Sequence, residues 1–289
     1  MPDRYEFPFK QNYLDIDGQR MHYVDEGSGP VVLLMHGEPT WSYLYRKMIP
    51  PLVAAGYRCI VPDLIGFGLS SKPEDESYYT LKRHVAQISE LIGKLKLQDM
   101  TVVGQDWGGP IGLGYAIENK TNIRSLVILN TLVAPMLLPG PFRLLFTHGG
   151  FSSFLIRRLD LMRKAAFMSG FHKKIDSRVK QQYLAPHPTP ASRAGVAAFP
   201  KLVPGRPNHV NYDYMVNMSE TLKKWDLPVL VMFSDKDIAF KVADGQNIAK
   251  MVPNGRFIKI RNAGHFLQED AGEELADNMI EFLGSEVWT

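Results

Sequence analysis

The sequence predicts an α/β protein with a mostly parallel central sheet, helices on both faces of the sheet and an inserted helical cap. Short, continuous apolar runs alternate along the chain with segments of helical character, which is typical of parallel strands buried on both faces. One long gap, between residues 130 and 228, interrupts this alternation. The alternation predicts the sheet, and the gap predicts the insertion.

The expected strands and helices follow in order. Residues 12–26 contain two alternating segments around Asp17-Gly18, which predicts a hairpin. Six short apolar runs then predict buried strands, at 31–35, 58–62, 100–104, 123–130, 228–233 and 256–260. Helices are expected between these runs, up to Ala55, around 80–96 and over 271–283.

The long gap cannot be a structureless loop, because loops of that length are rare in compact domains. It contains breaks at Pro and Gly and helical stretches, but no run typical of a buried strand. We therefore expect a main domain at 1–132 and 223–289 and a helical cap at 133–222. The cap should lie over the carboxyl ends of the strands, where open α/β sheets bind their ligands.

Composition excludes several classes of protein. The 289 residues suffice for one domain with an insertion, and 33 basic against 30 acidic residues are too balanced for a nucleic-acid partner. MPDRYEFPFK at the N-terminus lacks the layout of a signal peptide, and no run reaches the roughly 18 apolar residues of a membrane span. We therefore expect a cytoplasmic protein without membrane contact. The single cysteine, Cys59, allows neither an internal disulfide nor a cysteine-rich metal site.

A carboxylate occupies the position of a nucleophile in GQDWGG at 104–109. An apolar run, a tight turn flanked by glycines and a helical segment form the nucleophile elbow of α/β hydrolases. The central residue is Asp106, which excludes a serine hydrolase. A carboxylate can displace a leaving group from an sp³ carbon, and hydrolysis of the resulting alkyl ester yields an alcohol. By itself Asp106 is equally suited to cap the following helix, so the assignment depends on its partners.

Those partners are a base and the acid that orients it. His265 follows the last apolar run, in NAGHFLQED, and the order nucleophile, acid, histidine is the one expected of this fold. The acid should follow the fifth buried run, where Asp235 and Asp237 both stand. We favour Asp237, because it precedes Ile238 as the chain leaves the strand, whereas Asp235 suits a turn at the strand end.

Ester hydrolysis also requires backbone N–H donors for the oxyanion. In this fold one donor belongs to the residue after the nucleophile, Trp107, and the other to the segment HGEPTW at 36–41, where the position is that of Glu38. A carboxylate at Glu38 would oppose ionisation of Asp106 unless it were paired or turned away. We expect it to bind the hydrolytic water or to orient the loop. The indole N–H of Trp107 is suited to bind a departing halide.

Five segments together resemble the haloalkane dehalogenases. They are HGEPTWSYLYRKMIP at 36–50, PDLIGFGLSSKP at 62–73, GQDWGG at 104–109, SDKD at 234–237 and NAGHFLQED at 262–270. The resemblance continues through YLAPHPTPASRAGVAAFPKLV at 183–203 and so covers nearly the whole chain. HGEPTW together with QDWGG looks like one subfamily of those enzymes.

The resemblance implies a nucleophile, an acid, a base and a first halide donor, at Asp106, Asp237, His265 and Trp107. It also implies a second halide-binding tryptophan in the cap. The four tryptophans are Trp41, Trp107, Trp225 and Trp288, so residues 133–222 contain none. Phe154 aligns with the missing residue, and a phenylalanine offers a halide only the weakly positive edge of its ring.

Hydrolysis of a haloalkane to an alcohol, a halide and a proton is the leading hypothesis. This chemistry needs no metal or organic cofactor, and we expect a monomer whose substrate is small, apolar and halogenated. The alternative is an epoxide hydrolase, which uses the same triad with a pair of cap tyrosines, for which Tyr183, Tyr212 and Tyr214 are available. A third hypothesis, a binding protein without turnover, leaves the base unexplained.

Overall fold

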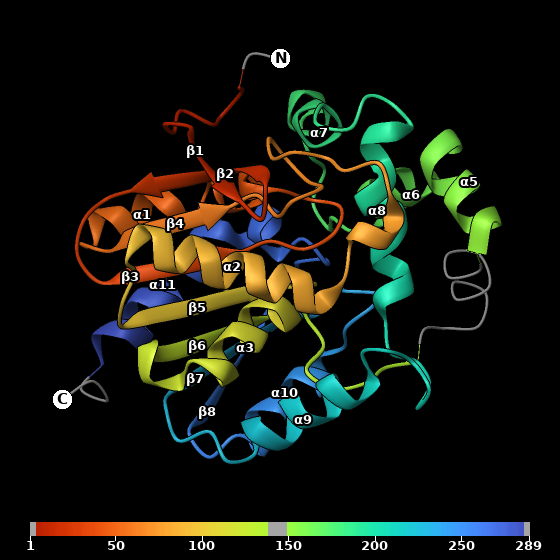
Figure 1. Ribbon diagram of the computed structural model, residues 1–289. Helices are drawn as coiled ribbons and strands as arrows, with labels where there is room; N and C mark the ends of the chain where they lie inside the picture. The colour runs from red at the N-terminus through yellow and green to blue at the C-terminus, as the bar shows by residue number, and fades with distance from the viewer. Residues whose placement is uncertain (1–3, 138–148, 286–289) are drawn as a thin grey trace.

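An eight-stranded sheet lies at the centre of the computed structural model, which describes residues 4–137 and 149–285 (Figure 1). The strand order is β1-β2-β4-β3-β5-β6-β7-β8. The strands are β1 (Asn12–Ile16), β2 (Gln19–Glu26), β3 (Val31–Met35), β4 (Arg58–Pro62), β5 (Met100–Gln105), β6 (Ile123–Leu129), β7 (Val229–Ser234) and β8 (Gly255–Ile260). β1 and β2 form the expected hairpin and β2 pairs antiparallel with β4, whereas every pair from β4 to β8 is parallel. The predicted fold class is confirmed.

Helices cover both faces of the sheet, and this explains the continuous apolar runs. In β3, Val32 and Leu34 belong to one hydrophobic cluster and Leu33 and Met35 to the other. Every residue of β3, β5 and β7 is buried, because successive side chains enter opposite layers. The two layers thus place a core on each side of the sheet.

The helices of the main layers have short connections to the strands. α2 (Leu81–Leu95) and α3 (Gly108–Glu118) pack together on one face, while α1 (Ile49–Ala54) and α11 (Leu267–Gly284) contact each other on the opposite face. α10 (Val242–Met251) packs on β7 and β8. Short 3-10 helices complete this part of the fold, as η1 (Ser42–Tyr45), η2 (Glu76–Tyr78) and η3 (Lys120–Asn122).

The segment between β6 and β7 is helical in the residues that the structure describes; residues 138–148 of the expected cap lie outside them. Its elements are α5 (Gly149–Leu159), α6 (Leu161–Ser169), α7 (Ser177–Leu184), η4 (Ala191–Arg193), α8 (Ala194–Ala198), η5 (Phe199–Leu202) and α9 (Tyr212–Leu222). Figure 1 shows α5–α8 gathered on one side of the sheet. α9 instead packs against α3, so this last helix adds to the main helical layer.

Candidate active site

The turn from β5 into α3 holds Asp106 in a conformation that few residues adopt. Its φ is +50°, in the left-handed region that costs energy for a residue with a side chain. Glycine at 108 is required by close packing, because a Cβ there would lie 2.1 Å from the backbone oxygen of Met35. The Asp106 N–H donates to the backbone oxygen of Asn130 at 3.0 Å. This geometry holds the carboxylate clear of the sheet.

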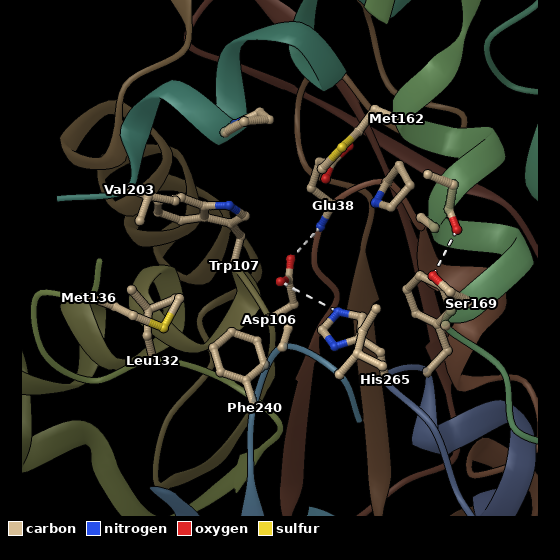
Figure 2. Close-up of a pocket in the computed structure, with 18 residues that line it drawn as sticks. Glu38, Asp106, Trp107, Leu132, Met136, Met162, Ser169, Val203, Phe240 and His265 are labelled. Atoms are coloured by element: carbon tan, nitrogen blue, oxygen red, sulfur yellow. Dashed lines mark hydrogen bonds and ion pairs between the residues drawn. The ribbon is translucent and has the colours of Figure 1, made fainter. Parts of the chain in front are cut away.

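Three strand ends bring Asp106, Asp237 and His265 together. His265 follows β8, and its Nδ1 lies 2.9 Å from Oδ2 of Asp237, which follows β7. Its Nε2 lies 3.6 Å from Oδ2 of Asp106 (Figure 2). The Asp237 side chain is fully buried and also accepts the backbone N–H of Ala239 at 2.7 Å. Parallel strands end at the same edge of the sheet, and for this reason residues distant in sequence meet there.

Asp235, the other candidate acid, has a different set of partners. Its carboxylate accepts the backbone N–H of Asn262 at 2.8 Å and lies 3.6 Å from the ammonium of Lys236. These contacts are those of a residue that closes a turn between two strand ends.

Charge governs the protonation of His265. Burial lowers the pKa of the imidazole, but the carboxylates of Asp237 and Asp106 outweigh burial through their charges and hydrogen bonds and raise the pKa to about 10. The histidine is therefore cationic at neutral pH as long as Asp106 carries its negative charge.

Glu38 places its backbone and its side chain in different roles. Its backbone N–H donates to Oδ1 of Asp106 at 2.8 Å (Figure 2). Burial first, and then the charge of Asp106, raise the pKa of the Glu38 carboxyl well above its usual value. The shift favours the neutral carboxylic acid, the form that does not oppose the ionisation of Asp106. Its Oε1 is buried without a hydrogen-bond partner.

A cavity of about 180 Å³ lies in front of Asp106. The main domain contributes Trp107, whose indole nitrogen faces the pocket in Figure 2 and whose ring meets Phe199 edge-on at 5.5 Å. The segment inserted after β6 contributes mostly apolar side chains from α6 and from the residues after η5, including Met162, Ala166 and Val203. Such walls suit an apolar ligand that meets few polar groups.

Phe154 does not reach this cavity, so its expected role as a halide contact is wrong. α5 turns Ser152, Leu155 and Ile156 inward, and helical periodicity directs Phe154 outward, where it is 54% exposed. It lines a separate surface depression. Trp41 and Trp225 are buried away from the pocket, and Trp288 lies outside the described residues.

None of the three candidate tyrosines lines the cavity in the described part of the chain. Tyr183 is fully buried and donates to Oε2 of Glu269 at 2.9 Å. Tyr214 donates to Oε1 of Glu118 at 2.9 Å. A phenol that could protonate an epoxide oxygen is therefore not placed beside Asp106 by the residues that the structure describes.

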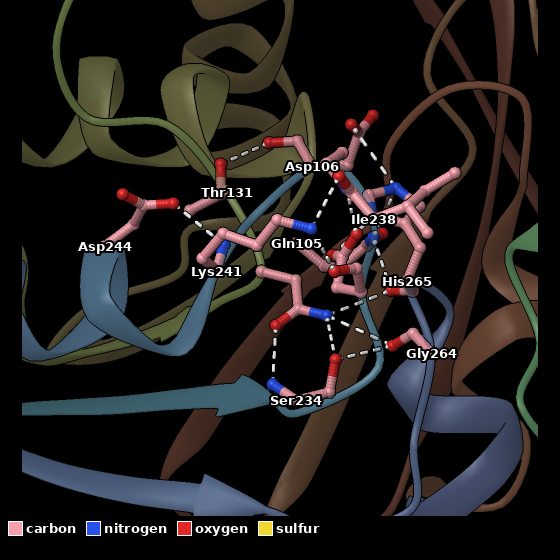
Figure 3. Close-up of polar contacts among 12 residues, drawn as sticks. Gln105, Asp106, Thr131, Ser234, Ile238, Lys241, Asp244, Gly264 and His265 are labelled. Atoms are coloured by element: carbon pink, nitrogen blue, oxygen red, sulfur yellow. Dashed lines mark hydrogen bonds and ion pairs between the residues drawn. The ribbon is translucent and has the colours of Figure 1, made fainter.

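Two residues near the triad were not singled out from the sequence. Asn130, directly after β6, donates to Oγ of Ser234 at 2.7 Å and to the backbone oxygen of Gly264 at 3.2 Å, which joins the ends of β6, β7 and the His265 loop (Figure 3). Phe240 stacks on His265 with ring centroids 5.7 Å apart. Asn130 and Phe240 both follow the ends of strands, and this position is the sequence signal that could have identified them as site residues.

No helix within residues 4–137 and 149–285 combines the length and hydropathy that crossing a bilayer requires. No group of three or more His, Cys, Asp or Glu side chains in the same ranges is arranged to hold a metal ion.

Known proteins are similar to this chain over most of its length. Residues 30–272 match the family model described as alpha/beta hydrolase fold. A haloalkane dehalogenase of Mycobacterium marinum is 39% identical over 285 residues, covering 95% of this chain and 94% of that protein. Haloalkane dehalogenase 1 of Mycobacterium tuberculosis is 41% identical, covering 95% and 93%. The crystal structure of haloalkane dehalogenase DatA from Agrobacterium tumefaciens superposes with a TM-score of 0.88 at 26% identity, over 98% of this chain and 99% of that one.

Proposed function

The chain belongs to the haloalkane dehalogenases, enzymes of the α/β hydrolase fold, and we propose that Asp106, Asp237 and His265 perform its hydrolysis of the carbon–halogen bond. One observation carries this assignment. Asp106 presents its carboxylate to an apolar cavity while Glu38 N–H binds one of its oxygens and His265 stands next to the other. This arrangement leaves a carboxylate oxygen directed at a bound alkyl group.

In the first step an Asp106 oxygen attacks the carbon that bears the halogen. The new carbon–oxygen bond forms as the carbon–halogen bond breaks, and the halide leaves with the bonding electron pair. The indole N–H of Trp107 supports this step, since it faces the pocket and offers a non-basic donor to the halide. The apolar walls favour a desolvated substrate, in which the nucleophile reacts without competition from water.

Ester formation prepares His265 for the second step. The negative charge of Asp106 helps to raise the pKa of His265. The ester is neutral and removes this charge, so the pKa of the imidazole falls, and His265 releases its proton and becomes a base. His265 then takes a proton from water, whose oxygen adds to Cγ of the ester. The backbone N–H groups of Glu38 and Trp107 are the proposed donors to the resulting oxyanion.

Breaking the bond between Cγ and the alkyl oxygen completes the cycle. The alcohol leaves with the proton held by His265, and the restored Asp106 carboxyl passes its proton back to His265. The resting state returns, and the one proton released per halide is the one that His265 gave up when the ester formed. Asp237 orients the imidazole and stabilises its cationic form. The neutral Glu38 carboxyl, with an oxygen that has no partner, is suited to hold the attacking water.

We further propose that the expected cap at 133–222, apart from α9, which belongs to the main helical layer, bounds the substrate. The cavity of about 180 Å³ supports a small substrate, and the side chains of α6 would exclude longer molecules. A tetrameric haloalkane dehalogenase from Paraglaciecola agarilytica, with a TM-score of 0.80 at 30% identity, is among the similar structures. The monomeric state and cytoplasmic location stay predictions.

The test measures halide and proton release from a series of bromo- and chloroalkanes, with styrene oxide run in parallel. We expect halide and protons in equal amounts, and no product from the epoxide. Asp106→Ala should abolish release, whereas Asp235→Ala, in the neighbouring turn, should retain most of it. Epoxide opening without halide release, or turnover by Asp106→Ala, would overturn the proposal.

A further inference from the structure

Gln105 contacts the proposed base although it lies next to the nucleophile in sequence. It is the last residue of β5, and its side chain is fully buried. Its amide nitrogen lies 3.2 Å from Nε2 of His265 and 3.2 Å from the backbone oxygen of the same residue (Figure 3). One amide group therefore meets both the ring and the backbone of His265.

The backbone contact determines which end of the amide faces the histidine. A carbonyl oxygen only accepts hydrogen bonds, so the NH₂ end of Gln105 must face it. The reversed amide would set Oε1 against that oxygen, with two acceptors in contact. In the neutral histidine, the second N–H of the same NH₂ group donates to Nε2, which is then the ring nitrogen that carries the lone pair.

This lone pair defines the tautomer. With Nε2 unprotonated, the proton of the neutral imidazole is on Nδ1, where Oδ2 of Asp237 accepts it at 2.9 Å. Asp237 and Gln105 thus act on opposite nitrogens and select the same neutral form. It is also the form that general-base catalysis requires, because only a free lone pair on the pocket side can take a proton from water.

The acidic groups around the ring act in the opposite direction. Asp106, Asp237 and Glu38 face His265, and the two aspartates favour the imidazolium. Phe240 and Phe266 flank the ring with centroids at 5.7 and 5.0 Å and add no charge. Gln105 offers an uncharged N–H donor to Nε2. A protonated Nε2 would set its own N–H against that donor, so this contact disfavours the imidazolium.

We propose that Gln105 is a positioning residue that holds His265 as a neutral base, with the lone pair of Nε2 free for the hydrolytic water. This rests on the proposed two-step reaction and concerns only its second step. As water enters, it replaces the amide at Nε2, while the amide keeps its bond to the His265 backbone oxygen. The proton then passes from water to Nε2 as the water oxygen adds to Cγ of the ester.

Two substitutions separate the donor from the shape of the side chain. Gln105→Glu keeps the length but places an acceptor at Nε2, which stabilises the imidazolium. Gln105→Met keeps the approximate length and removes both donor and acceptor. Gln87→Met is the matched control. Gln87 lies on α2 and is also buried, but its side-chain amide donates to Asp17 and Tyr78.

The readouts resolve the two steps. Rapid mixing should give a full burst of halide from Gln105→Glu, followed by ester hydrolysis slowed roughly tenfold or more, with the alkyl adduct on Asp106 accumulating in the mass spectrum. The acid limb of the hydrolysis rate should move to higher pH. Gln105→Met should slow hydrolysis less, and Gln87→Met should leave both the rate and the pH profile unchanged.

The possible failures are distinguishable. Hydrolysis by Gln105→Glu at the original rate and with the original pH profile would overturn the role of Gln105 and leave the proposed function intact. A lack of halide burst and adduct in the unmodified enzyme and in His265→Gln would instead overturn the proposed function itself. If Gln105→Glu does not fold, Gln105→Met decides: unchanged hydrolysis in that variant refutes the proposal.

Discussion

Two histidine–aspartate pairs in this molecule have almost the same geometry and different surroundings. His265 Nδ1 lies 2.9 Å from Asp237, and His22 Nδ1 lies 2.8 Å from Asp63. The His22 pair is wholly buried, and its Nε2 has no partner. The His265 side chain is 14% exposed, lines the cavity, and directs Nε2 to Asp106 and Gln105.

Access of the second ring nitrogen to the cavity, and not the pair itself, distinguishes the candidate catalytic histidine. Both carboxylate oxygens of Asp63 have structural partners. Besides contacting His22, they accept the backbone N–H groups of Ser42 and Leu69, each at 2.7 Å. Asp63 joins β2, the loop after β4 and the start of η1. The pair at His265 leaves one face of its base open to the pocket, where a water or an ester can react.

The largest expected effect comes from removing the base. His265→Gln should slow ester hydrolysis by roughly a thousandfold or more, while halide is released once per active site and an alkyl adduct remains on Asp106. Mass spectrometry of the intact protein after addition of a bromoalkane checks this. An unmodified Asp106, with a substrate that the parent enzyme converts, would contradict the role of His265 in the second step.

The corresponding change in the structural pair should affect stability instead. Asp63→Asn leaves three donors without their carboxylate acceptor, and losing hydrogen bonds to a charged group costs about 1.5–3 kcal/mol of the free energy of unfolding. Denaturant titration measures this loss. Turnover per folded molecule should stay within about twofold of the parent, because Asp63 does not line the pocket; a catalytic loss as large as that of His265→Gln would erase the distinction between the pairs.

The two pairs should also respond to opposite ends of the pH scale. The buried Asp63 has its pKa lowered to about 2, where its partners outweigh the effect of burial, so its stabilisation is complete above about pH 4 and is lost as pH falls through 2. The pKa of His265 is raised to about 10, so its stabilisation is complete below about pH 6.5 and is lost as pH rises through 10.

Thermal melting at a series of pH values tests these signs. The Tm difference between the parent and Asp63→Asn should shrink toward acid pH. The difference between the parent and His265→Gln should shrink toward alkaline pH. Differences that change in the reverse directions would show that the charges of the pairs have been assigned wrongly.

The smallest effect is expected at the cap. Tyr183 donates to Glu269, which also binds the buried guanidinium of Arg46 at 2.6 Å, so Tyr183→Phe removes one of several contacts and should cost about 1–2 kcal/mol of stability. Dehalogenation should persist, since the hydroxyl lies outside the pocket. Loss of turnover without loss of stability would make the phenol catalytic, as an epoxide hydrolase requires.

Much of the sheet could be predicted because strand and turn signals are local. The six apolar runs became β3 to β8 with ends that agree or differ by one residue, and Asp17 and Gly18 form the hairpin turn with φ of +53° and +67°. The helical cap segment was less predictable in detail. The sequence favoured a helix for α5, but it did not show that this helix lies away from the pocket, and Phe154 was misplaced for that reason.

Local signals in the sequence predicted the fold class and the proposed order of nucleophile, acid and histidine, because hydrophobic period and turn chemistry are properties of neighbouring residues. They also pointed to the carboxylate at the elbow, since the glycines around Asp106 are contiguous with it. What depends on distance across the sheet came from the tertiary structure alone: the raised pKa of Glu38, the contact of Gln105 with His265, and the position of Phe154 away from the cavity. Burial and charge act through space, and residues 160 positions apart, such as Gln105 and His265, meet only after the strands align.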